Sequence, residues 1–152
     1  MAYGSCKPKE LKQLIKLQKQ SIRILSGKNY LSHTDPLFGK LGLLKLADIF
    51  KINVLSFMYN YNNTLVPKSF NDMFRPLHPP NRTNCYKLER TKCKTLDIFP
   101  KAQFPKIWND TCIELKSSQT LKALKQKYFN STVFEYNNFT CSTPDCVSCT
   151  LP

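Results

Sequence analysis

The chain has 152 residues, of which 41% are hydrophobic, and a formal net charge of +13. This length suits a single domain, and so large an excess of Lys and Arg favours partners with phosphate backbones or anionic lipid surfaces. Ribosomal, chromatin-binding and transposon proteins share this charge balance. No apolar run reaches about eighteen residues, so we expect no membrane-spanning helix and no membrane partner.

The N-terminal residues MAYGSCKPKE lack the apolar core of a secretory signal. We therefore expect an intracellular protein, nuclear or cytoplasmic, in which most of the seven cysteines are thiols. An odd number of cysteines also argues against a closed set of disulfides. Chance then explains the five Asn-x-Ser/Thr triplets, which start at Asn62, Asn81, Asn109, Asn130 and Asn138.

The segment from Pro8 to Gly27 is predicted to form an amphipathic helix. Pro8 suits a first helical turn, and Gly27 suits the left-handed residue that follows a helix. One narrow arc of the helix is cationic and consists of Lys9, Lys12, Lys16, Lys19 and Arg23. The opposite half is apolar, is expected to be buried, and consists of Leu11, Leu14, Ile15, Leu17, Ile22, Ile24 and Leu25. The cationic arc is either a solvated helix face or a rail that binds a polyanion.

Gln18 projects from the middle of the apolar half, where an unpaired amide would cost on the order of 1–3 kcal/mol. We therefore expect it to bond to a backbone group of the next element. The bond is expected at the seam between this helix and the second long helix. Between the two long helices we expect a short corner helix with Pro36 in its first turn, ended by Gly42. His33, just before this helix, is expected to have a packing or surface role and not a catalytic one.

A second long helix, Leu43 to Tyr61, is apolar around most of its circumference, which is typical of a helix between two neighbours. We expect the two long helices to pack on each other through Ile15, Ile22, Phe50 and Phe57.

The rest of the chain is less regular. Residues 75–105 hold several prolines and are predicted to be irregular or partly extended, with a strand near Thr95–Phe99. A C-terminal helix is predicted from Leu121 to Phe129. The expected fold class is thus mainly α, with a helical domain over 1–130 and a flexible, polar, Cys-containing tail over 131–152.

Catalytic motifs are not apparent. The chain has no Gly-rich phosphate loop, no Gly-x-Ser-x-Gly and no His-Glu-x-x-His, and its few carboxylates are scattered, unlike those of a two-metal site. We therefore expect no enzyme activity and no cofactor.

Three cysteines of the tail, Cys141, Cys146 and Cys149, have a spacing that could supply three ligands to zinc or to an iron–sulfur cluster. A fourth ligand would have to come from Cys85, Cys93, Cys112 or a histidine. Because no second Cys-x-x-Cys pair completes the set, we expect no metal and a flexible tail with free thiols.

Basic and aromatic residues together are typical of proteins that bind single-stranded nucleic acid. Aromatic rings that could stack on bases are Tyr30, Phe38, Tyr86 and Trp108, although a core position is the favoured interpretation for each. A second basic segment is a loop with Arg82, Lys87, Arg90, Lys92 and Lys94. The predicted partner is the phosphate backbone of RNA or DNA, bound by this loop and by the cationic arc of the first helix.

Several blocks of the sequence occur in a familiar order. They are Tyr3-Gly4-Ser5 before LKQLIKLQKQSIRIL, then His33-Thr34-Asp35-Pro36-Leu37-Phe38, Leu43 to Ile49, Phe57-Met58-Tyr59 with Leu65-Val66-Pro67 and Phe70, Lys106-Ile107-Trp108-Asn109, and the helix to Phe129. Over residues 2 to 130 this order resembles the region that follows the reverse-transcriptase domain in LINE-type, jockey-like (non-LTR) retrotransposon polyproteins. The chain departs from that pattern at Tyr3, where a tryptophan is usual, and at Phe104-Pro105, where a glycine is usual.

The resemblance implies a non-catalytic C-terminal fragment of a reverse transcriptase, because the aspartates of the RNA-directed DNA polymerase lie upstream in that family. It also implies a reverse-transcriptase domain as a further partner. Two alternatives to this interpretation stay open. In the first, the chain is a structural remnant or a domesticated packing module and binds no nucleic acid. In the second, it is a small zinc-binding interaction module built on the cysteine tail.

Overall fold

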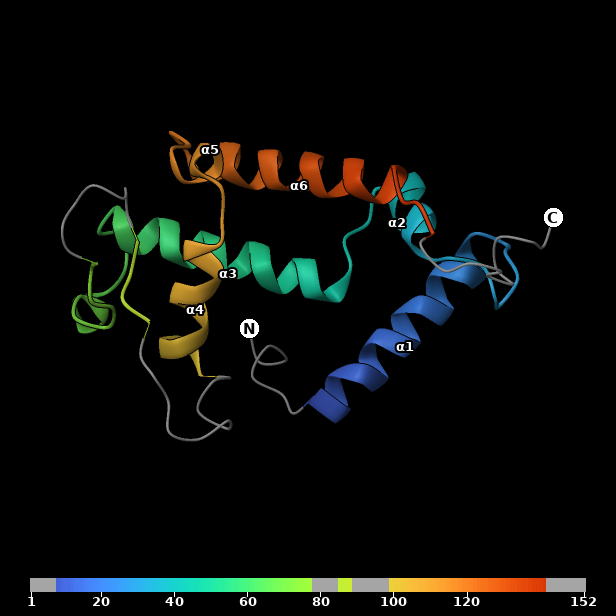
Figure 1. Cartoon of the computed structure of the whole chain (residues 1–152), viewed down its shortest axis with the longest axis horizontal. Helices are drawn as coiled ribbons and strands as arrows, with labels where there is room; N and C mark the ends of the chain where they lie inside the picture. The colour runs from blue at the N-terminus through green and yellow to red at the C-terminus, as the bar shows by residue number, and fades with distance from the viewer. Residues whose placement is uncertain (1–7, 78–84, 89–98, 142–152) are drawn as a thin grey trace. The chain divides into compact units, whose positions relative to one another are not determined.

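The structure is a computed structural model, and it describes residues 8–77, 85–88 and 99–141 (Figure 1). Within these ranges the chain is mainly helical and has no β-strand, which confirms the predicted fold class. None of the helices in these ranges combines the length and the apolar character that crossing a bilayer requires. The contacts divide the described chain into two units, a central unit of residues 50–128 and an N-terminal unit of residues 8–49 with 129–141.

The N-terminal unit begins with α1 (Pro8–Leu25), whose limits agree with the prediction. Gly27 after it has φ +60°, the left-handed conformation that favours glycine. The corner helix α2 (Asp35–Leu41) is also confirmed, and it ends at Gly42, again with φ +60°. Both turns are therefore encoded by single glycines at the predicted positions.

Gln18 makes the predicted link between α1 and the chain that follows α2. Its Nε2 donates to the carbonyl of Leu44 at 3.1 Å, and its Oε1 accepts from the N–H of Leu46 at 2.9 Å. Leu46 is the first residue of α3 (Leu46–Asn62), where a backbone N–H has no acceptor inside the helix. One amide side chain therefore fixes the start of α3 to the middle of α1.

The last turn of α6 (Leu121–Asn137) closes the same unit through Tyr136. The N–H of Lys45 donates to the Tyr136 hydroxyl at 3.3 Å, and this hydroxyl donates to the carboxylate of Asp48. The Lys45 ammonium lies 4.2 Å from the centre of the Tyr136 ring and pairs with Asp35 at 2.6 Å. We call this arrangement the Tyr136 junction.

Only part of the apolar half of α1 is buried, which corrects the sequence prediction. Ile22 packs in a small core with Leu37, Phe38 and Tyr136. In contrast, four side chains of the same half are 43–79% exposed, namely Leu14, Leu17, Ile24 and Leu25. Ile24 and Leu25 follow Ile22 directly but lie on other sides of the helix, since successive residues are rotated by about 100°.

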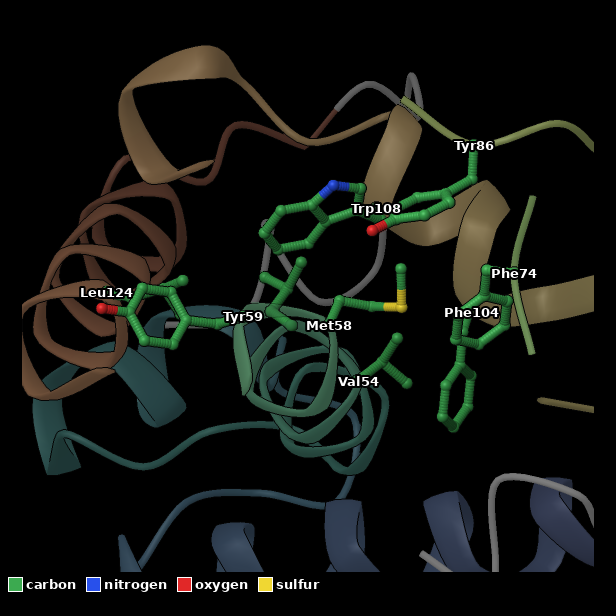
Figure 2. Packing of buried hydrophobic residues seen from close by; sticks show 9 residues of the cluster. Val54, Met58, Tyr59, Phe74, Tyr86, Phe104, Trp108 and Leu124 are labelled. Carbon is green, nitrogen blue, oxygen red and sulfur yellow. The ribbon is translucent and has the colours of Figure 1, made fainter. Parts of the chain in front are cut away.

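The core of the central unit gathers around Met58 of α3 (Figure 2). Trp108 of α4 (Pro100–Asn109), Leu124 of α6 and Phe74 join it, and all are almost fully buried. Phe50 and Phe57 pack against this core, whereas Ile22 belongs to the core of the N-terminal unit. The predicted pairing of Ile15 and Ile22 with Phe50 and Phe57 would join the two units, and it stays a prediction.

Two short helices complete the central unit, the 3₁₀ helix η2 (Lys68–Phe70) and α5 (Ile113–Lys116). Helix α4 begins at Pro100, inside the segment predicted to be irregular, and it contains Pro105. A proline there removes one helical hydrogen bond, but the same turn buries Phe104, Pro105 and Trp108. This burial explains why a helix forms where the prolines predicted none.

Residues 75–77 and 85–88 are extended, as predicted, and meet in one antiparallel bridge between Pro76 and Tyr86. The side chain of Asn109 exchanges two hydrogen bonds with the backbone of Tyr86, at 2.9 and 2.7 Å. The Tyr86 hydroxyl donates to Asn62. The amides of Asn62 and Asn109, which start two of the Asn-x-Ser/Thr triplets, are thus engaged in packing the chain. The predicted strand at Thr95–Phe99 lies outside the described residues except for Phe99.

The C-terminal helix differs most from its prediction. The hydroxyl oxygen of Thr120 accepts from the N–H of Ala123 at 3.1 Å and caps its start. The helix does not end at Phe129 but runs on to Asn137, so the boundary placed at residue 130 falls inside α6. Thr132 and Tyr136, assigned to the polar tail, are buried.

Candidate nucleic-acid interface

The cationic arc of α1 is accessible along its length. Lys9, Lys12, Lys16 and Lys19 are exposed, and Arg23 is half-buried. No described carboxylate lies within ion-pair distance of Lys12, Lys16 or Lys19. The helix is therefore free to present its ammonium groups to an external anion.

Four of these cations line one surface hollow of about 410 Å³ within the N-terminal unit. The residues that line it are Lys12, Ile15, Lys16, Lys19, Gln20, Arg23 and Tyr30. Its described lining thus holds four positive charges and no carboxylate. Such a concave surface concentrates the positive potential and attracts polyanions.

Arg23 has a second task at the end of the row. Its Nε donates to the carbonyl of Ser32 at 2.9 Å and so ties the loop after α1 back onto the helix. Arg23 also lines the hollow. Arg23 is therefore both a structural and a candidate binding residue, unlike the three lysines.

The basic loop is described only at Lys87, which is exposed and belongs to the central unit. The other predicted binding residues of this loop lie outside the described residues, namely Arg82, Arg90, Lys92 and Lys94. Their role stays a prediction.

The four candidate stacking rings divide sharply by burial. Phe38, Tyr86 and Trp108 are 2%, 7% and 1% exposed, so they are core residues. Tyr30 is 76% exposed and lines the hollow with the cations. The helical projection of α1 identified the lysines, but it gave no reason to select Gln20 or to link Tyr30 to them, because Tyr30 lies on the loop.

The candidate metal ligands are mostly undescribed. Cys141 follows α6 and is half-buried, whereas Cys146 and Cys149 lie outside the described residues. In the described part of the chain, no group of three His, Cys, Asp or Glu side chains could hold a metal ion. His33 packs on the ring of Phe139 with the centroids 5.1 Å apart, in line with the expected packing role.

Comparisons with family models, with curated proteins and with solved structures give no match for this chain. The hollow on α1 therefore has to be interpreted from its own geometry and charge.

Proposed function

We propose that the chain is a non-catalytic module that binds the phosphate backbone of RNA or DNA along the cationic face of α1. The observation that carries this proposal is the hollow lined by Lys12, Lys16, Lys19 and Arg23 with no carboxylate in its described lining. Cationic side chains without internal partners keep their charge available for an external anion.

The spacing of the four cations suits a chain of phosphates. From Lys12 to Arg23 the helix rises by about 16 Å, at 1.5 Å per residue. Positive groups spread over this length can contact successive phosphates of one strand. Contacts of this kind position a nucleic acid without reading its sequence, so we expect little sequence preference.

The resemblance of residues 2 to 130 to the region after the reverse-transcriptase domain of LINE-type polyproteins gives this proposal a context. In that setting the module would hold template RNA or target DNA near a polymerase domain, which would be its protein partner. The exposed apolar residues of α1 are compatible with such a protein contact, although the proposal does not depend on them.

The test measures affinity against salt concentration. Each phosphate contact releases condensed counterion, so log affinity should fall with log salt by about 0.7 per contact on a single strand and about 0.9 on duplex DNA. Four contacts give a slope near −3 on single-stranded RNA. Changing Lys12, Lys16 and Lys19 together to Gln should reduce the magnitude by about two units. Arg23 is kept, because it holds Ser32.

A matched control changes Lys122, Lys125 and Lys127 to Gln. These three lysines are also exposed and lie on the first turns of α6. Their replacement removes the same total charge. The proposal predicts a smaller effect on the slope for the control. Equal losses in both triple variants would mean that overall charge, and not α1, drives binding. A parent protein without salt-dependent binding to RNA or DNA would leave the cationic arc as a solvated face.

A further inference from the structure

We infer that the hollow on α1 selects single-stranded nucleic acid over duplex, because an unpaired base stacks on Tyr30 beside the row of cations. The inference rests on the proposed function and names the class of ligand that the same site takes.

The first observation is the position of the ring. Tyr30 is 76% exposed, yet it lines the same hollow as Lys12, Lys16, Lys19 and Arg23. A single exposed aromatic residue is ordinary on a protein surface. An exposed ring that shares a concave surface with four cations supplies both parts of a single-strand site, a charged track for phosphates and a flat surface for a base.

The second observation is that the loop carrying this ring is fixed. Gly27 turns the chain out of α1, and the N–H of Lys28 donates to the carbonyl of Arg23 at 3.0 Å. The side chain of Asn29 accepts from the N–H of Leu31 at 3.2 Å, while the N–H of Ser32 donates to the carbonyl of Asn29 at 3.0 Å. Tyr30 thus lies within a hydrogen-bonded turn.

Arg23 connects this turn to the row of cations. Its Nε holds the carbonyl of Ser32 at 2.9 Å, so both sides of the turn are attached to the last residue of the row. Because the backbone around Tyr30 is already ordered, stacking a base on it costs little conformational entropy. The same bond sets the ring at the Arg23 end of the row, where a strand that follows the lysines would arrive.

Duplex and single strands differ in what they can offer this ring. In a duplex, each base is stacked on its neighbours and paired, so no base offers a free face to Tyr30. In a single strand, a base can be splayed out and placed on an aromatic face. The cations attract both ligands, and the ring favours only one of them.

The experiment compares the parent protein with Tyr30→Ala and Tyr30→Phe on three probes of equal length. The probes are an oligouridylate, an abasic sugar-phosphate strand and a DNA duplex. On oligouridylate, Tyr30→Ala should bind on the order of tenfold more weakly, within the range known for one base stacked on one aromatic side chain. Tyr30→Phe keeps the ring and should bind as the parent does.

The abasic strand and the duplex are the decisive controls. Neither offers an unpaired base, so the parent and Tyr30→Ala should bind each of them equally. The salt dependence on oligouridylate should also be unchanged in Tyr30→Ala, because a phenol ring displaces no counterion. A loss that extends to the abasic strand would mean that Tyr30 acts by holding the loop, and it would overturn the inference.

The two hypotheses fail in distinguishable ways. If the parent shows no salt-dependent binding to any probe, the proposed function fails and the inference fails with it. If the parent binds with the expected salt dependence and the triple lysine variant reduces this dependence as predicted, but Tyr30→Ala binds oligouridylate like the parent, only the inference fails. Because Tyr30 is exposed, thermal unfolding of both variants should match that of the parent.

Discussion

Gln18 offers the sharpest test of how α1 is attached to the chain after it. Replacing Gln18 by Met keeps nearly the same length and volume but removes both hydrogen bonds, to the carbonyl of Leu44 and from the N–H of Leu46. A hydrogen bond of this kind contributes roughly 0.5–1.5 kcal/mol net. The two together predict a loss of about 2 kcal/mol in the free energy of unfolding.

The loss should not reach the cost of two fully buried unpaired groups, because both bonds are only partly buried and water can reach them. For a chain of this size, about 2 kcal/mol corresponds to a fall of roughly 4–8 °C in the midpoint of thermal unfolding. Urea denaturation followed by circular dichroism measures the free energy. Hydrogen exchange at the Leu46 amide reports the local effect, and its protection should fall.

Gln13→Met is the matched control, since Gln13 lies on the same helix and is exposed. It should change the free energy of unfolding by no more than about 0.5 kcal/mol, as is usual at surface positions. The reasoning would be refuted if the two variants were equally stable, or if Gln18→Met left the Leu46 amide as protected as in the parent protein.

Two further predictions concern the central unit. Burial, with a smaller contribution from Tyr61, raises the pKa of Tyr86 from 10.0 to about 12. The folded state thus holds this proton more tightly than the unfolded chain does. The free energy of unfolding, which has its full value below pH 10, should therefore fall by roughly 2–3 kcal/mol as the pH rises from about 10 to about 12. Urea midpoints across this range should show the fall in the parent and not in Tyr86→Phe, and parallel curves would contradict it. Leu124→Ala should lower the free energy of unfolding, measured by urea denaturation, by about 2–5 kcal/mol, because the Leu124 side chain is 0% exposed. Lys125→Ala, at the exposed neighbouring position, should lower it little. Equal losses would show that Leu124 is not a core residue.

Local signals were enough to predict α1 and α2 of the N-terminal unit. Pro8, Gly27 and Gly42 act through backbone conformation, which depends on the residue itself and its immediate neighbours. Gln18 was predictable for a related reason, because an amide in an apolar stripe needs a partner and the nearest unpaired groups belong to the following segment. The cationic arc of α1 was visible in the sequence because the helical period places its lysines on one face.

The predictions that failed concern features that depend on contacts between segments far apart in the chain. The helical projection of α1 treats Ile22 and Leu25 alike, yet only Ile22 meets Phe38 and Tyr136, while Leu25 is 70% exposed. The end of α6 was missed because polar residues follow Phe129, although Leu124, Thr132 and Tyr136 recur at multiples of four and all three are buried. Tyr30 was one of four equal candidates, and only its exposure distinguishes it.

The Tyr136 junction also sets the order in which the protein can be assembled on the ribosome. Its two hydrogen bonds join residues 91 and 88 positions apart in sequence. At about 5–20 residues per second, Tyr136 is synthesised roughly 5–20 s after Lys45. Helix α1 can meet the start of α3 much sooner through Gln18, whose two bonds span 26 and 28 positions. The small core around Ile22 is completed only when Tyr136, the last of its four residues in the sequence, is present.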